Sequence, residues 1–164
     1  MQRPWLTPQE LRAWRAYRDL TLVLDDALDQ QLRRESGLSH LSYSVLVFLS
    51  EAPERRLRMT DLAAELKIAR TRLSYTVSRM EEAGWVRRED SAGDKRAQMA
   101  VLTDVGLAVL EDAAPGHAAM VRAAVFDRLT PEQVHAFGEA CEIILAGLTG
   151  PDRPTLPTEL PWRR

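Results

Sequence analysis

The sequence predicts a mainly α-helical fold that carries one small β-hairpin. Three observations support this fold class. Apolar residues recur every three or four positions over most of the chain, capping motifs precede these stretches, and a polar turn separates two short strand-like segments. The chain has 164 residues, of which 45% are hydrophobic. A chain of this size and composition is expected to form one compact unit around its own core.

A long amphipathic helix is predicted for residues 7–36. Thr7, Pro8 and Glu10 form a capping box with proline at the first helical position. Apolar or neutral side chains then recur at helical spacing as far as Leu32, and Gly37 provides a stop. A second helix, over residues 42–50, is apolar nearly all round, so we expect it at the centre of the core.

Two further helices joined by a tight turn come next. Thr60 is expected to cap the first of them, and the second begins near Arg70. Three apolar residues of the second helix lie within about 60° of one another at about 100° per residue, so they form its buried stripe. They are Leu73, Val77 and Met80. Gly84 suits the left-handed position after the end of this helix.

A β-hairpin and two more helices complete the predicted fold. Residues 85–90 and 98–102 are strand candidates, and residues 91–94 form the polar turn between them. Thr103 caps a long helical stretch that we expect to bend or break at Pro115. Thr130 repeats the capping-box pattern and begins the last helix. The apolar side of that helix consists of Val134, Phe137, Cys141, Ile144, Leu145 and Leu148.

The order of helix, turn, helix and basic hairpin is that of a winged helix-turn-helix, whose second helix enters the major groove of DNA. A polar helix face is more often simply solvated, and the hairpin that follows is what favours DNA binding here. We expect the DNA-binding residues to be Arg70, Thr71, Arg72, Ser74, Tyr75, Ser78 and Arg79 of the helix, with Arg88, Asp94, Lys95 and Arg96 of the hairpin.

Within the hairpin, different arginines have different expected roles. Arg87 and Arg88 are predicted to contact phosphates. Arg96 at the tip is predicted to enter the narrow minor groove, whose negative potential attracts arginine, while Asp94 braces its guanidinium group. The charge distribution agrees with this interpretation. Residues 55–96 contain 11 Lys or Arg and 7 Asp or Glu, a net charge of +4 in a chain whose net charge is −2.

These residues resemble the multiple antibiotic resistance regulator (MarR) family from about Thr7 to Leu148. The resemblance rests on three motifs and their spacing. They are Asp61-Leu62-Ala63, then Arg79-Met80-Glu81 with Gly84, then Asp94-Lys95-Arg96 followed by Val101-Leu102-Thr103 and Gly106. The resemblance implies a transcription regulator that is a homodimer with intertwined terminal helices. Each protomer would place the helix that begins near Arg70, called the reader helix, in one of two successive major grooves, and Arg96 would contact the flanking minor groove.

The resemblance also implies a division of the chain. We expect residues 1–164 to form a single unit, with a DNA-binding lobe at 42–103 and dimerisation helices at 7–36 and 104–149. The Pro-rich tail at 150–164 is either a flexible end or an arm packed on a neighbour. Two residues depart from the family pattern. Ala69 stands where many members have a capping serine, and Cys141 lies in the last helix, where we expect packing rather than redox sensing.

Two features of the flanking helices predict partners. Their apolar surface exceeds what a chain of this length hides by itself, which favours a homodimer and hence a near-palindromic operator with half-sites about 10 base pairs apart. The family resemblance suggests a small phenolic or lipophilic effector between these helices and the DNA-binding lobe. Trp14, Tyr17, His40 and Tyr43 are candidates to line that pocket, although aromatic residues at helical spacing are more often core.

Other classes of protein are disfavoured. The three histidines are scattered and no catalytic or phosphate-loop motif is present, so we expect no enzyme activity, no cofactor and no metal site. A single cysteine excludes an intramolecular disulfide. No stretch resembles a signal peptide or a membrane span, which favours a cytoplasmic protein. The alternative is a protein-interaction module that keeps the fold without binding DNA.

Overall fold

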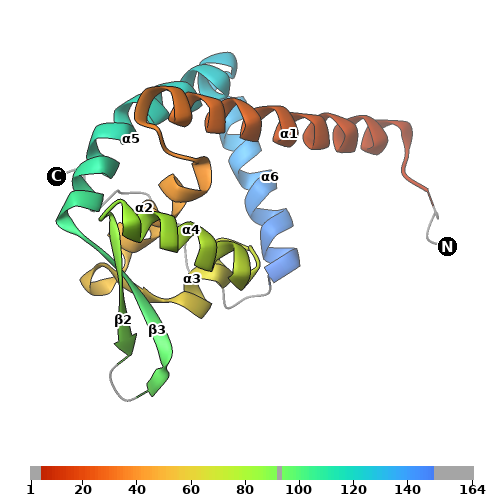
Figure 1. Cartoon of the computed structure of the whole chain (residues 1–164). Helices are drawn as coiled ribbons and strands as arrows, with labels where there is room; N and C mark the ends of the chain where they lie inside the picture. The colour runs from red at the N-terminus through yellow and green to blue at the C-terminus, as the bar shows by residue number, and fades with distance from the viewer. Residues whose placement is uncertain (1–4, 92–93, 150–164) are drawn as a thin grey trace.

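The computed structural model describes residues 5–91 and 94–149, with the backbone alone for residues 91 and 94–96. The tail predicted for residues 150–164 lies outside this part. Figure 1 shows the element order. The elements are α1 (Pro8–Ser36), α2 (His40–Glu51), the 3₁₀ turn η1 (Pro53–Arg55), β1 (Arg56–Arg58), α3 (Met59–Glu65), α4 (Arg70–Glu82), β2 (Val86–Ser91), β3 (Asp94–Leu102), α5 (Asp104–Ala124), the 3₁₀ turn η2 (Phe126–Arg128) and α6 (Pro131–Thr149). The predicted fold class is confirmed.

One lobe contains α2, α3, α4 and a three-stranded antiparallel sheet of order β1-β3-β2. Strands β2 and β3 form the predicted hairpin, which projects beyond the helices in Figure 1. Strand β1 was not predicted. It pairs with β3 from Arg56 opposite Val101 to Arg58 opposite Met99. A three-residue strand is too short to show alternation in the sequence, and it forms because β3 offers it an edge.

Capping motifs set the ends of the long helices as predicted. The backbone N–H of Glu10 donates to the Thr7 hydroxyl and the N–H of Thr7 donates to the Glu10 carboxylate, which completes the capping box of α1. These bonds lower the pKa of Glu10. Gly37 ends α1 in the left-handed region at φ 68°. Thr130 and Gln133 exchange the equivalent bonds at the start of α6.

Four predicted boundaries are wrong. Strand β3 begins at Asp94, four residues before the expected start, and Asp94 pairs with Ser91 where a turn over residues 91–94 was predicted. Helix α2 begins at His40 because Ser39 caps it, two residues before the expected start. Helix α3 begins at Met59, so Thr60 lies in its first turn, where its hydroxyl donates to Asp61 instead of capping the helix. Helix α5 continues through Pro115 to Ala124, so of the predicted bend or break the break is wrong. Both Pro115 and the residue four positions earlier are exposed, so water can bond to the carbonyl that loses its N–H partner.

The hydrophobic core lies beneath α4 and around α2. The stripe predicted for α4 is confirmed, since Leu73 and Val77 are fully buried and Met80 is 1% exposed. Val45, Leu46 and Leu49 give α2 the central position expected of it. Leu110 of α5 and Leu32 of α1 extend the same cluster, so α1 and α5 are each attached to the lobe through part of their length.

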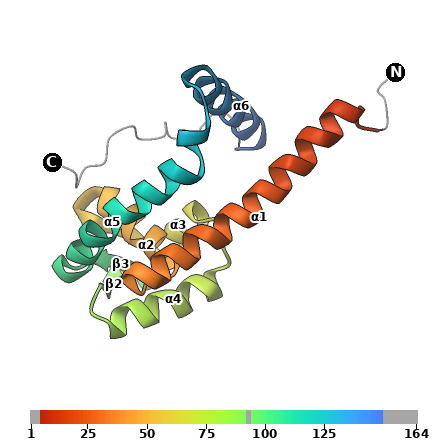
Figure 2. The ribbon, with the colours of Figure 1, turned by 90° about the horizontal axis from the view of Figure 1, so that it is seen from above.

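The N-terminal half of α1 and the whole of α6 have no cover within one chain. Figure 2 shows the N-terminal half of α1 extending past the lobe and α6 standing clear of it. No residue of α6 is buried. The exposed apolar side chains of these two helices include Leu11, Trp14, Tyr17, Leu20, Leu22, Val23, Phe137, Ile143, Ile144 and Leu148. No helix in the described ranges is both long and apolar enough to cross a membrane.

A close contact at Gly106 joins the base of the hairpin to α5. The Thr103 hydroxyl caps α5 by accepting the N–H of Gly106, and it lies 2.7 Å from the carbonyl oxygen of Gly84. A Cβ at position 106 would lie 2.0 Å from the carbonyl oxygen of Trp85. The close approach of two backbone segments therefore requires glycine here.

We predict that Gly106→Ala lowers the free energy of unfolding by about 1–3 kcal/mol, because the backbone must move to admit a methyl group. Gly147→Ala in α6 is the matched control, since a Cβ there meets no atom within 4 Å. Urea unfolding of both variants at one protein concentration checks this. Equal midpoints for Gly106→Ala and the wild type would show that the contact is absent.

Candidate nucleic-acid interface

The outward face of α4 presents most of the side chains predicted to bind DNA. The buried stripe fixes the rotation of the helix, so the opposite side faces solvent. Arg70, Thr71, Arg72 and Arg79 are exposed, and Tyr75 is 68% exposed although it is aromatic. A tyrosine at such a position presents an apolar ring and a hydroxyl to whatever lies against the helix.

The arginines of α4 differ from those of the sheet in their partners. Within the described part of the chain, Arg70, Arg72 and Arg79 form no ion pair. In contrast, Arg56 and Arg87 both bond to Glu89, the latter at 2.7 Å. Guanidinium groups without a carboxylate partner keep their full charge and all their donors for a ligand.

Arg88, which is predicted to contact phosphates, has bonding partners within the chain, and its phosphate contact stays a prediction. Its Nη2 donates to the carbonyl oxygen of Ser74 at 2.7 Å and to the hydroxyl of Ser78 at 3.0 Å. Its backbone N–H donates to the Glu81 carboxylate, and its side chain is only 22% exposed. Arg88 therefore ties β2 to α4, and it turns two predicted DNA-binding serines toward the hairpin.

Strand geometry explains why two neighbouring arginines differ. Successive side chains of a strand point to opposite faces, so only one of Arg87 and Arg88 can face α4. Arg87 points away and is 55% exposed, where it bonds to Glu89. The sequence alone does not indicate which face of β2 meets the helix. The sequence shows two consecutive arginines in a strand that follows a helix with two serines, but it does not show which arginine faces those serines.

The tip of the hairpin carries three more predicted site residues. Asp94, Lys95 and Arg96 begin β3, where Asp94 pairs with Ser91, at the end of the hairpin far from the helices in Figure 1. Their side chains lie outside the described residues, so their predicted roles stay predictions. At the start of α4, Ala69 is the N-cap and supplies no side-chain cap, as its residue type requires.

The four residues predicted to line an effector pocket form two separate pairs. The rings of Trp14 and Tyr17 are tilted relative to each other at a centroid distance of 6.0 Å, and both residues are more than half exposed. His40 lies at the other end of α1, where its N–H donates to Asp29. The rise of a helix puts Trp14 about 22 Å from Asp29. One pocket formed by all four within a single chain is therefore ruled out.

His40 and Tyr43 instead meet His117 of α5. The ring of His117 lies 4.4 Å from that of Tyr43 and 5.7 Å from that of His40, measured between centroids. Its Nδ1 and the Oε1 of Gln31 are buried with no hydrogen-bond partner in the described part. Burial lowers the pKa of His117, and the charge of His40 lowers it further. The sequence does not place His117 here, because only the fold brings α5 onto α2.

Neither a metal centre nor a buried thiol is found in the part of the chain that the structure describes. No three metal-ligating side chains come together there. The prediction that Cys141 is a packing residue is wrong for the single chain, since it is exposed. The reason is that α6 stands clear of the lobe, which leaves its apolar side uncovered.

Comparison with known proteins agrees with this arrangement. Residues 36–97 match the sequence profile of the MarR family. The HTH-type transcriptional regulator PapX of Escherichia coli is 31% identical over 71 residues, which span 43% of this chain and 43% of PapX. The match to this curated relative thus spans less than half of its length. The HTH-type transcriptional repressor YetL of Bacillus subtilis is 30% identical over 101 residues, 62% of this chain and 60% of YetL.

Solved structures resemble the chain over its whole length. Sco3205, a MarR family transcriptional regulator from Streptomyces coelicolor in complex with DNA, is 51% identical with a TM-score of 0.84, covering 99% of this chain and 100% of that one. AbsC, a MarR family transcriptional regulator from the same organism, is 38% identical with a TM-score of 0.82, covering 91% and 100%. The chain therefore belongs to the MarR family, which is a family of transcriptional regulators and not of enzymes.

Proposed function

We propose that this protein binds a near-palindromic site in double-stranded DNA as a homodimer and thereby regulates transcription. The observation that carries the proposal is the outward face of α4, where Arg72, Tyr75 and Arg79 are exposed and the arginines have no ion-pair partner in the described part. An α-helix fits the major groove, and arginine binds guanine there through two hydrogen bonds. The similarity to Sco3205, whose structure was solved with DNA, supports the same function.

The dimer rests on the uncovered apolar sides of α1 and α6. A monomer in water rarely exposes this many large apolar side chains on two helices. A second copy is the proposed cover, because a two-fold axis between these helices presents both α4 helices on one side of the protein. Successive major grooves on one side of a duplex are about 34 Å apart, which sets the required spacing of the two α4 helices.

We also propose that the protein represses transcription and that a small ligand releases it from DNA. YetL is named a repressor, which supports repression here. The junction of the buried Tyr43 with the half-buried His40 and His117, where the Nδ1 of His117 has no partner among the described residues, supports a small aromatic ligand that carries a hydrogen-bonding group. Binding there would act between α2 of the lobe and α5, the helix that leads on to α6 of the proposed dimer contact. If no phenol in a broad panel changes the affinity for DNA, the ligand part is refuted.

The alternative is a protein-interaction module without DNA binding. In such a module the exposed arginines of α4 would have no assigned role, whereas in the DNA-binding proposal they bind bases and phosphates. The two functions differ in a direct readout, namely whether the folded dimer enriches any sequence from a random pool of duplexes.

We predict that Arg72→Ala relaxes the base preference at particular positions of the selected site and costs about 1–3 kcal/mol of binding free energy on that site. Selection from random duplexes, run in parallel for wild type and variant, measures this. Arg34→Ala is the control, since Arg34 is equally exposed but lies on α1 and pairs with Glu35. An Arg72→Ala variant with the wild-type preference at every position would contradict the assignment of α4 as the reader.

We predict that the wild type sediments at twice the 18.5 kDa mass of the chain, and that Ile144→Asp shifts it to a monomer that binds DNA weakly. The introduced charge would have to be buried in the dimer. Val105→Asp is the control, because Val105 is similarly exposed, at 57%, on a helix end outside the proposed contact. Sedimentation velocity at micromolar concentration decides this, and a monomeric wild type would refute the dimer.

We predict that Arg88→Ala lowers the unfolding free energy of the DNA-free protein by about 1–3 kcal/mol, because it removes the bonds that the largely covered Arg88 side chain makes to Ser74 and Ser78. Arg72→Ala should change that free energy by no more than about 0.5 kcal/mol, as expected for an exposed side chain. Urea unfolding without DNA compares the two. Equal, small effects would mean that Arg88 does not tie the hairpin to α4.

A further inference from the structure

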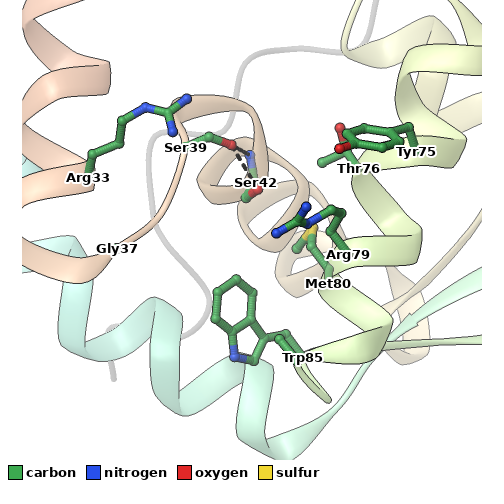
Figure 3. Close-up of a pocket in the computed structure, with 10 residues that line it drawn as sticks. Arg33, Gly37, Ser39, Ser42, Tyr75, Thr76, Arg79, Met80 and Trp85 are labelled. Atoms are coloured by element: carbon green, nitrogen blue, oxygen red, sulfur yellow. Dashed lines mark hydrogen bonds between the residues drawn. The ribbon is translucent and has the colours of Figure 1, made fainter.

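A cavity of about 480 Å³ lies beside α4, on the side away from the hairpin. Figure 3 shows it between the end of α1, the start of α2 and α4, with Trp85 on one side. The lining residues are Arg33, Gly37, Ser39, Ser42, Tyr75, Thr76, Arg79, Met80, Ala83 and Trp85. Arg33, Ser39, Ser42 and Trp85 have no role in the interface described so far.

The two flanks of α4 are treated differently by the fold. At about 100° per residue, Ser74, Ser78 and Glu81 share one flank, and this flank is occupied by Arg88. Thr76, Arg79 and Ala83 share the opposite flank, and this flank opens into the cavity. One side of the reader helix is therefore closed by the protein itself, and the other side is open.

The open flank is positively charged. None of the ten lining residues is acidic, and two of them are arginines. The Arg33 Nε donates to Asp29, which also accepts the N–H of His40. The bond from Arg33 is the largest cause of the lowered pKa of Asp29. Asp29 thus holds Arg33 in place, and Figure 3 shows its guanidinium group turned toward Ser39. The charges of Arg33 and Asp29 cancel, so the net positive charge of the cavity comes from Arg79.

The two serines supply a further donor. Ser39 Oγ and Ser42 Oγ lie 2.8 Å apart and share one hydrogen, and Ser39 Oγ also accepts the N–H of Ser42. Two hydroxyls carry two hydrogens, so the second is free to donate into the cavity. Arginines, a hydroxyl donor and no carboxylate in the lining are the chemistry that binds an oxyanion.

We propose that this cavity holds a phosphate group of the DNA backbone, with Arg33 and Arg79 as its cations. This rests on the proposed function. A helix of about 10–12 Å diameter fills a major groove of about 12 Å width, so each flank of the helix faces a phosphodiester strand. The flank toward the hairpin is taken by Arg88, and the phosphates on the other side meet the cavity. A phosphate contact fixes the register of α4 without reading a base.

A free aromatic carboxylate has the same oxyanion chemistry and would place its ring beside Trp85. The phosphodiester is the favoured occupant because Tyr75, Thr76 and Arg79 line the cavity from the reader helix itself. A ligand there contacts the DNA-facing element directly. The test therefore includes benzoate as a probe of the free anion.

The experiment measures affinity for the selected duplex against salt concentration for wild type, Arg33→Ala, Arg33→Lys and Arg34→Ala. Arg34 is the next residue on α1, is exposed, pairs with Glu35 and does not line the cavity. For Arg33→Ala we expect a loss of affinity of about tenfold that is uniform across sequences, and a salt slope smaller by about 1 for each protomer bound. Arg33→Lys should recover part of both, because its point charge still neutralises a phosphate.

Three outcomes overturn the proposal. If Arg33→Ala has the affinity and salt slope of Arg34→Ala, no phosphate is bound at the cavity, while the proposed function stands. If benzoate changes Trp fluorescence in the wild type but not in Arg33→Ala, and the salt slopes agree, the occupant is a free anion. If the folded wild type binds no duplex at low salt, the proposed function fails together with this inference. Circular dichroism checks that both Arg33 variants are folded.

Discussion

The burial of Leu73, Val77 and Met80 fixes how α4 is rotated about its axis, and the arrangement of its polar side chains follows from that rotation. Each of these apolar side chains contributes about 2 kcal/mol by leaving water, so turning the helix would cost several times that amount. Because these apolar side chains point inward, Arg72, Tyr75 and Arg79 on the other side of the helix face solvent. The rotation of this single helix therefore decides which polar side chains form the outward face that we propose binds DNA.

Arginine serves two purposes around this helix, and its surroundings decide which. Arg88 is largely shielded and bonds to backbone and hydroxyl oxygens of α4, so it stabilises the angle between helix and hairpin. Arg79 is exposed and unpaired among the described residues, so its charge is available to a ligand. A planar group with five donors can do either. The basic residues of this lobe thus include one, Arg88, whose donors are already bonded within the chain.

Local features of the fold could be predicted from the sequence, and features that depend on distant contacts could not. Thr7, Gly37 and Thr130 act on their own backbone, so their capping roles follow from neighbouring residues. Strand β1 and the inward turn of Arg88 depend on β3 and α4, which lie far away in sequence. The same reason brings His117 to Tyr43, whereas the separation of Trp14 from His40 follows from the rise of α1 alone. The outward face of α4 was predicted because one helix carries both its core stripe and its polar side.

The orientation of α4 on DNA is the central claim, and a structure of the dimer bound to its selected duplex tests it most directly. We expect α4 in the major groove, with a polar atom of Arg72 or Tyr75 about 2.7–3.2 Å from a base edge, Arg79 against a phosphate, and Arg88 still bonded to Ser74 and Ser78. An Arg88 released onto a phosphate, or a duplex that approaches another face of the lobe, would contradict it.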